Sequence, residues 1–267
     1  YVSDLGYYVA IEKMRGEAGT VAEFTVMRPA GDGFFDEIEF TITRRHVTEQ
    51  TVMYHRYLTE DGTVTDIGII KILQFDAKTP QQFIAAVDEL TREGVDKLVF
   101  DVRYNPGGEL DSITEILDYL LPEGPIIRAV DRNGKWDTIY SNASSIDLPM
   151  AVLVNGSTAS AAELFTSALR DYGKAVVVGT RTFGKGTMQS VIPLDDGSAI
   201  SISTRMYYPP FSDNYEGVGI APDIVVEMAD EVKHINIYKI NDWQDTQLQA
   251  AIEALMSLES ISADNEP

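Results

Sequence analysis

Residues 150–163 read MAVLVNGSTASAAE. The first five are all apolar, which is typical of a strand that a sheet buries on both faces. From residue 160 the apolar positions recur with helical spacing, and Gly173 is placed to end that helix. The inward positions of the helix are Leu164, Phe165, Ala168 and Leu169. A buried strand that leads directly into an amphipathic helix is the repeating unit of α/β folds, so this stretch predicts that class.

The same alternation extends in both directions from this stretch. Apolar runs at 67–73, 97–102 and 175–178 predict three more strands. A helix is predicted to begin at Pro80, since proline suits the first turn, and another is predicted over 110–120. Strands separated by helices in this way predict an α/β layered core with mostly parallel strands.

The two ends of the chain have a different pattern. Residues 4–15 have helical spacing, and strand-like runs at 21–27 and 37–43 follow. One helix and one hairpin cannot bury a core, so we expect the back half of a small module whose front half lies outside this sequence. Further along, 188–204 predicts a hairpin and 245–258 a helix. The predicted divisions are residues 1–46 for the half module, 47–65 for linker and cap strands, 66–230 for the α/β core and 231–267 for a C-terminal helical segment.

Charge and composition exclude several classes of function. The chain has 267 residues with 42 acidic and 21 basic side chains, a formal net charge of −21, and no cysteine. A surplus of this size argues against nucleic acid or an anionic membrane surface as a partner. No apolar run approaches the roughly 20 residues of a bilayer span, so no transmembrane segment is predicted. The lack of cysteine excludes disulfides, thiolate nucleophiles and cysteine-based metal sites.

Histidine offers no obvious chemistry either. His46, His55 and His234 are scattered, and none has a second ligand-type residue at metal spacing. A Ser-His-Asp hydrolase would need one of them, and the sequence has no Gly-x-Ser-x-Gly elbow. Surface or strand-end positions are therefore the favoured interpretation of the three histidines.

A glycine-rich segment with one lysine follows the strand at 175–178. Residues 179–186 read GTRTFGKG, one residue away from the phosphate-loop pattern. The residue after the lysine should supply a hydroxyl for Mg²⁺, but Gly186 has none. Residues 187–192 also alternate like a strand, whereas a phosphate loop opens into a helix. A nucleotide site is therefore disfavoured. A purely structural turn would explain the glycines but not Lys185 between two of them.

Ser160 has two interpretations. With Glu163 three residues later it can form a capping box, which is an ordinary way to begin a helix. The alternative is a nucleophilic serine at a helix N-terminus, where backbone N–H groups and the helix dipole stabilise a developing oxyanion. A nucleophilic serine needs a base. With the histidines disfavoured, Lys185 remains as the partner in a Ser-Lys arrangement.

Four segments together resemble one protease family. STASAAE at 157–163 and TFGKGTMQ at 182–189 closely resemble motifs of the C-terminal processing peptidases, also called tail-specific proteases. In that family the serine and lysine lie 25 positions apart and a glutamine follows four later, as Ser160, Lys185 and Gln189 do. FDVRYNPGG at 100–108 and GVGIAPDI at 217–224 resemble two further signatures. The resemblance extends from about residue 66 to 258. It departs at Tyr104 and Ala162, neither of which is a catalytic group.

The resemblance implies a fold and a biological setting. The family fold is an α/β core related to crotonase and Clp protease, and residues 1–46 resemble the C-terminal half of the PDZ domain that accompanies this core. The first half of that domain, with its carboxylate-binding loop, has no counterpart in this sequence. The family implies unstructured polypeptide C-termini as substrates, held as an added strand beside a sheet. It implies no metal, nucleotide or organic cofactor. It also implies an extracytoplasmic location in the periplasm or cell envelope, with membrane association left open.

The mechanism that follows is a serine endopeptidase reaction. Ser160 is the expected nucleophile, Lys185 the base, and Gln189 the uncharged group that orients the amine. The expected oxyanion donors are the backbone N–H groups of Ala161 and Gly108, with Gly107 as the alternative to Gly108. A lysine must be neutral to accept a proton, so local burial has to outweigh the attraction of a chain with net charge −21. Phe183 and the N-terminus of the helix that begins at Ser160 are the groups expected to favour the neutral form of the lysine. The alternative function is a non-catalytic peptide-binding scaffold derived from such a protease.

Overall fold

The computed structural model describes residues 1–31, 33–143 and 145–263, which form two compact units, Tyr1–Glu49 and Gln50–Pro267. The smaller unit contains two short helices, α1 (Val2–Leu5) and α2 (Tyr7–Met14), and an antiparallel pair, β1 (Val21–Gly31) and β2 (Phe34–Thr43). The helix predicted over 4–15 is interrupted at Gly6, whose φ of 81° is not helical. The assignment of this unit to half of a PDZ domain stays a prediction.

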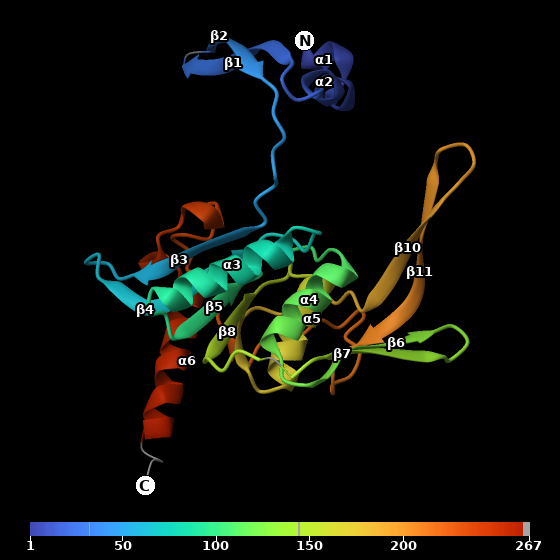
Figure 1. Cartoon of the computed structure of the whole chain (residues 1–267). Helices are drawn as coiled ribbons and strands as arrows, with labels where there is room; N and C mark the ends of the chain where they lie inside the picture. The colour runs from blue at the N-terminus through green and yellow to red at the C-terminus, as the bar shows by residue number, and fades with distance from the viewer. Residues whose placement is uncertain (32, 144, 264–267) are drawn as a thin grey trace. The chain divides into compact units, whose positions relative to one another are not determined.

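The larger unit is built on a six-stranded sheet, labelled in Figure 1. Four of its five strand pairings are parallel, and only β3 pairs antiparallel, with β4. The prediction of mostly parallel strands is therefore confirmed. The segment 47–65 contributes a strand to this sheet. In spatial order the strands are β12 (Ile224–Val225), β9 (Ala175–Gly179), β8 (Met150–Val154), β5 (Lys97–Asp101), β4 (Val64–Ile72) and β3 (Val52–Leu58).

Helices cover both faces of this sheet. Three pack on one face, where Phe83, Phe100 and Phe165 form an aromatic cluster with ring centroids 5.3–6.4 Å apart. The fourth helix packs on the opposite face through residues such as Leu248. Strand β8 illustrates the alternation, because Val152 points to the first layer and Leu153 to the second. The three helices are α3 (Thr79–Arg92), α4 (Leu110–Leu120) and α5 (Ala161–Asp171), and the fourth is α6 (Thr246–Ala263).

A second, antiparallel sheet adjoins this core in the larger unit. Its order is β10 (Thr187–Pro193), β11 (Ala199–Tyr208), β6 (Gly124–Asp131) and β7 (Trp136–Ser141). The β10–β11 hairpin confirms the one predicted over 188–204, and it extends away from the core in Figure 1. The β6–β7 hairpin is not apparent in the sequence pattern. Two 3₁₀ turns, Ile237–Lys239 and Asp242–Gln244, precede α6. None of the described helices is long and apolar enough to cross a bilayer.

A buried ion-pair network joins the end of β5 to the start of α6. The Arg103 guanidinium donates to Asp101 at 2.8 and 2.9 Å and to Asp245 at 2.7 and 3.0 Å. Burial alone would raise the pKa of the Asp101 carboxyl, but Arg103, with a smaller contribution from Lys71, outweighs burial and lowers it below 3.8. The guanidinium therefore keeps the Asp101 carboxylate ionised, and its hydrogen bonds to Asp101 and Asp245 tie the C-terminal helix to the strand that leads into the 104–108 loop.

This network predicts a specific loss of stability in acid. Because the folded-state pKa of Asp101 is depressed, its stabilisation is present above the unfolded value of about 3.9 and is lost as pH falls through the folded-state pKa. Asp101→Asn is therefore expected to lower the free energy of unfolding most near neutral pH, and the difference from wild type should shrink on acidification. Urea unfolding followed by tryptophan fluorescence measures this, since Trp136 and Trp243 both lie in the larger unit.

The fully exposed Asp147 provides the control, because Asp147→Asn should change stability little at any pH. A difference between Asp101→Asn and wild type that stayed constant down to acid pH would contradict the assignment.

Candidate active site

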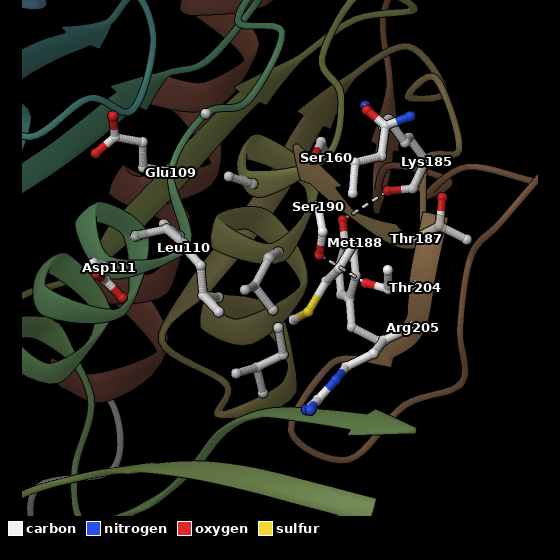
Figure 2. Close-up of a pocket in the computed structure, with 17 residues that line it drawn as sticks. Glu109, Leu110, Asp111, Ser160, Lys185, Thr187, Met188, Ser190, Thr204 and Arg205 are labelled. Atoms are coloured by element: carbon white, nitrogen blue, oxygen red, sulfur yellow. Dashed lines mark hydrogen bonds between the residues drawn. The ribbon is translucent and has the colours of Figure 1, made fainter. Parts of the chain in front are cut away.

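The predicted site residues gather around one cavity of about 600 Å³ in the larger unit. Ser160, Lys185, Gln189, Gly108 and Ala161 all line it. Figure 2 shows the start of α4 on one side of the cavity and strands β10 and β11 on the other. The fold thus brings together segments that lie more than 50 residues apart in the sequence. Apolar side chains complete the lining, among them Leu110, Ile113, Ile127, Leu164 and Met188.

Ser160 occupies a strained turn between β8 and α5. Its φ of 55° and ψ of −118° are values that residues other than glycine rarely adopt. Such a conformation costs on the order of 1–3 kcal/mol and persists only where the surroundings fix it. The preceding residue is fixed because the Ala159 N–H donates to the Asn105 carbonyl at 2.9 Å. Ser160 is also the N-cap of α5, and its own N–H donates to Glu163 Oε2 at 2.9 Å. Ser160 is therefore both the N-cap of α5 and the strained residue of the turn.

Lys185 lies in the loop between β9 and β10. Its Nζ donates to Gln189 Oε1 at 3.3 Å. The pairing of β10 with β11 shifts register at Met188/Gln189, and such a shift changes the direction in which the side chains of a strand point. Among the hydrogen bonds of the described residues, none joins Ser160 Oγ to Lys185 Nζ. Catalytic hydrogen bonds are often long in the absence of substrate, and both side chains reach the same cavity.

The predicted role of Phe183 in burying Lys185 is wrong. The Phe183 ring is 64% exposed and does not line the cavity. Its backbone N–H instead donates to the Thr158 carbonyl at 3.0 Å, so the residue fixes the loop through its main chain. The apolar surface of the cavity that Lys185 also lines comes from side chains of α4, α5, β6 and β10.

The Gly107-Gly108 pair has no room for side chains, because Gly107 lies against the serine turn and Gly108 against the Phe75 backbone. A Cβ on Gly107 would lie 2.8 Å from both Ser160 Cβ and the Ala161 nitrogen, and one on Gly108 would lie 1.9 Å from the Phe75 carbonyl oxygen. The Gly107 N–H already donates to Asn105 Oδ1 at 2.8 Å.

The N–H groups of Gly108 and Ala161, in contrast, have no acceptor among the described residues. The geometry thus favours Gly108 over Gly107 as the partner of Ala161 in an oxyanion hole.

Sequence reasoning assigned no role to Tyr207, which also lines the cavity. Its phenol donates to the Lys185 carbonyl at 2.6 Å and accepts from the Tyr215 hydroxyl at 3.1 Å. Burial raises the pKa of Tyr207, which keeps the phenol protonated at neutral pH, while interactions with the hydroxyls of Tyr215 and Ser160 act in the opposite direction. Tyr207 lies 47 positions after Ser160 in a strand that begins with alternating polar residues, so local pattern alone could not place it here.

The rejected alternatives remain rejected in the structure. The glycine-rich loop leads from β9 into strand β10, whereas a phosphate loop would open into a helix. None of the three histidines lines the cavity, and His55 is paired with Asp242 at 2.9 Å on the surface.

Comparison with known proteins decides the family. The sequence pattern of peptidase family S41 matches residues 66–226, which contain all the residues that line the cavity. The chain belongs to peptidase family S41.

Other S41 proteins cover most of this chain. The carboxy-terminal-processing protease of Bartonella bacilliformis is 36% identical over 226 residues, which are 82% of this chain and 50% of that protein. The carboxyl-terminal-processing protease of a Picosynechococcus species is 32% identical over 97% of this chain and 60% of its own length. A solved photosystem II D1 C-terminal processing protease is 29% identical, with a TM-score of 0.60 over 79% of this chain and 57% of that one. This S41 chain therefore spans about half the length of the relatives it matches, and the predicted fold is confirmed.

The close approach at the S41 glycine pair predicts a graded loss of stability. Gly107→Ala should destabilise the protein through both its φ of 100° and its backbone contacts. Gly134, at φ 79° in the β6–β7 turn with nothing near its Cβ position, is the matched control. We expect Gly134→Ala to cost about 1–2 kcal/mol from the backbone alone and Gly107→Ala to cost clearly more. Thermal unfolding of the two variants measures this, and equal melting temperatures would contradict the tight contact.

Proposed function

We propose that this S41 chain is a serine endopeptidase that cleaves unstructured C-terminal segments of polypeptides through a Ser160–Lys185 dyad. The observation that carries the proposal is the coincidence of four features at one cavity. These are a serine in a strained strand-to-helix turn, a lysine, and two backbone N–H groups that have no acceptor in the described part of the chain. Strained turns of this kind expose nucleophiles in other hydrolases.

The proposed reaction gives each of these groups a role. Ser160 Oγ attacks the scissile carbonyl carbon, and its proton passes to Lys185 Nζ. The tetrahedral oxyanion accepts hydrogen bonds from the N–H groups of Gly108 and Ala161. Lys185 then protonates the leaving amine, the peptide C–N bond breaks, and an ester on Ser160 remains. Water hydrolyses that ester, with Lys185 acting as base for the second time. Gln189 orients the amine through the contact at 3.3 Å.

The surroundings of the cavity support an extended polypeptide as substrate. Strand β10 is the outermost strand of its sheet, so its outer edge is free of a neighbouring strand within the described residues. Thr187, Met188 and Gln189 of this strand also line the cavity. A substrate segment that adds to this edge would pass directly by Ser160 and Lys185, and main-chain pairing of this kind requires an unstructured segment.

The names of the relatives support the same substrate class, because the curated relatives are named as carboxy-terminal-processing proteases. From the family resemblance we infer a location in the periplasm or cell envelope, with polypeptides as partners and no cofactor in the reaction.

Cleavage of an unstructured protein tests the proposal. Wild type should cleave casein, whereas Ser160→Ala and Lys185→Ala should lose at least about 10³-fold in rate, as for other triads and dyads that lose a member. Gln189→Ala should lose about 10-fold, because the amine keeps its chemistry but loses its orientation. Gel electrophoresis and mass spectrometry of the products provide the readout.

Matched controls are available for both residue types. Ser157→Ala lies in the same turn as Ser160, and Lys135→Ala removes an exposed lysine from the same unit, and both variants should cleave like wild type. Equal cleavage by wild type, Ser160→Ala and Lys185→Ala would refute the dyad. Binding of the polypeptide by wild type without cleavage would instead indicate a peptide-binding scaffold.

A further inference from the structure

The side chain of Glu163 connects the two halves of the candidate dyad. It is fully buried, and its carboxylate accepts four hydrogen bonds. Oε2 accepts from the backbone N–H of Ser160 at 2.9 Å and from that of Lys185 at 2.8 Å. Oε1 accepts from the Gly184 N–H at 2.7 Å and from the Thr182 hydroxyl at 2.5 Å. One carboxylate therefore contacts both the serine turn and the lysine loop.

These four bonds compensate the charge of the buried carboxylate. No salt bridge within the described part of the chain includes Glu163, so hydrogen-bond donors take the place of a counter-ion. The Thr182 hydroxyl accepts from the Ile220 N–H at 2.7 Å, which directs its single proton toward Glu163. All four donors therefore direct their hydrogen atoms at the carboxylate. A protonated carboxyl group or an amide in its place could not accept all four hydrogen bonds.

A helix cap alone does not require this arrangement. Capping α5 uses only the contact between Glu163 and the Ser160 N–H. The other three donors come from residues 182–185, which belong to a different loop and have no part in the helix. Two of these donors are the backbone of Lys185 and of the residue before it.

We propose that Glu163 is the positioning residue that fixes the lysine loop against the serine turn, and so sets where Lys185 begins relative to Ser160. This inference rests on the proposed function. Glu163 then has two roles, because the carboxylate that caps the start of the helix also holds the loop that carries Lys185. Misplacement of a catalytic group by about 1 Å costs on the order of 10²-fold in rate. Even a small displacement of the lysine loop should therefore lower the cleavage rate measurably.

Glu163→Gln is the direct test, because the amide keeps the shape of the side chain but turns one acceptor oxygen into a donor. In one orientation its NH₂ group faces the N–H groups of Ser160 and Lys185, and in the other it faces that of Gly184. We expect kcat on casein-derived peptides to fall by about 10²-fold while KM changes less than about threefold. Thr166→Val, which removes a buried hydroxyl from the same helix without touching either loop, should leave kcat unchanged.

A second pair of variants covers the case in which Glu163→Gln does not fold. Thr182→Val removes one of the four bonds and should lower kcat about 10-fold, and Thr182→Ser, which keeps the hydroxyl, should restore it to within about threefold of wild type. An unchanged kcat in Glu163→Gln, or in Thr182→Val when Glu163→Gln is unfolded, would overturn the proposal. So would a fall in kcat that Thr182→Ser fails to restore.

Hydrogen exchange separates this inference from the proposed function. In Glu163→Gln the amides of residues 181–187 should exchange at least about tenfold faster than in wild type, whereas those of β5 and β8 should not change. This readout needs no activity. If wild type shows no Ser160-dependent cleavage, the proposed function is refuted. Unchanged hydrogen exchange of residues 181–187 in Glu163→Gln would independently refute the proposal that Glu163 fixes the lysine loop.

Discussion

The buried carboxylate of Glu163 is the interaction on which the geometry of the site depends. A charge with no exposure to water is stable only if donors surround it, and the four donors here belong to two loops that follow neighbouring strands of one sheet. Parallel strands bring their carboxyl ends to the same edge, so the loops after β8 and β9 are adjacent by topology. The hydrogen bonds of the carboxylate to both loops fix the distance between the two loops. The strained backbone of Ser160 is fixed by its surroundings, because its N–H donates to Glu163 and Gly107 lies so close that a Cβ there would meet Ser160.

The third loop of the site depends on a more distant set of charges. Residues 104–108 follow β5, and the Arg103 side chain just before them is held by Asp101 and by Asp245 at the start of α6. A C-terminal helix on the opposite face of the sheet therefore contributes to the anchor of the glycine pair. This arrangement fits the finding that residues beyond 230 belong to the same compact unit as the strands and helices that line the cavity.

Much of the fold could be predicted from the sequence because parallel strands buried on both faces are rich in apolar residues. The runs at 97–102, 150–154 and 175–178 were recognisable for that reason, as were the helices that alternate with them. The β6–β7 hairpin was not, since its strands are only partly buried and its apolar residues do not alternate cleanly. Within the site, the family resemblance pointed to Ser160, Lys185 and Gln189, and the structure places all three at one cavity. The contacts of Glu163 with residues 182–185 and the position of Tyr207 are products of tertiary packing, which no local pattern encodes.

The proposed reaction requires Ser160 to be a nucleophile that accepts an acyl group. The most direct measurement is peptide mapping by mass spectrometry after the protein is mixed with an activated ester of an unstructured peptide and quenched in acid. The acyl group is expected on the tryptic peptide that contains Ser160, and the mass added to that peptide should equal the mass of the activated ester minus that of the leaving alcohol. Ser160→Ala should show no adduct. An adduct on another residue, or one that persists in Ser160→Ala, would contradict the claim.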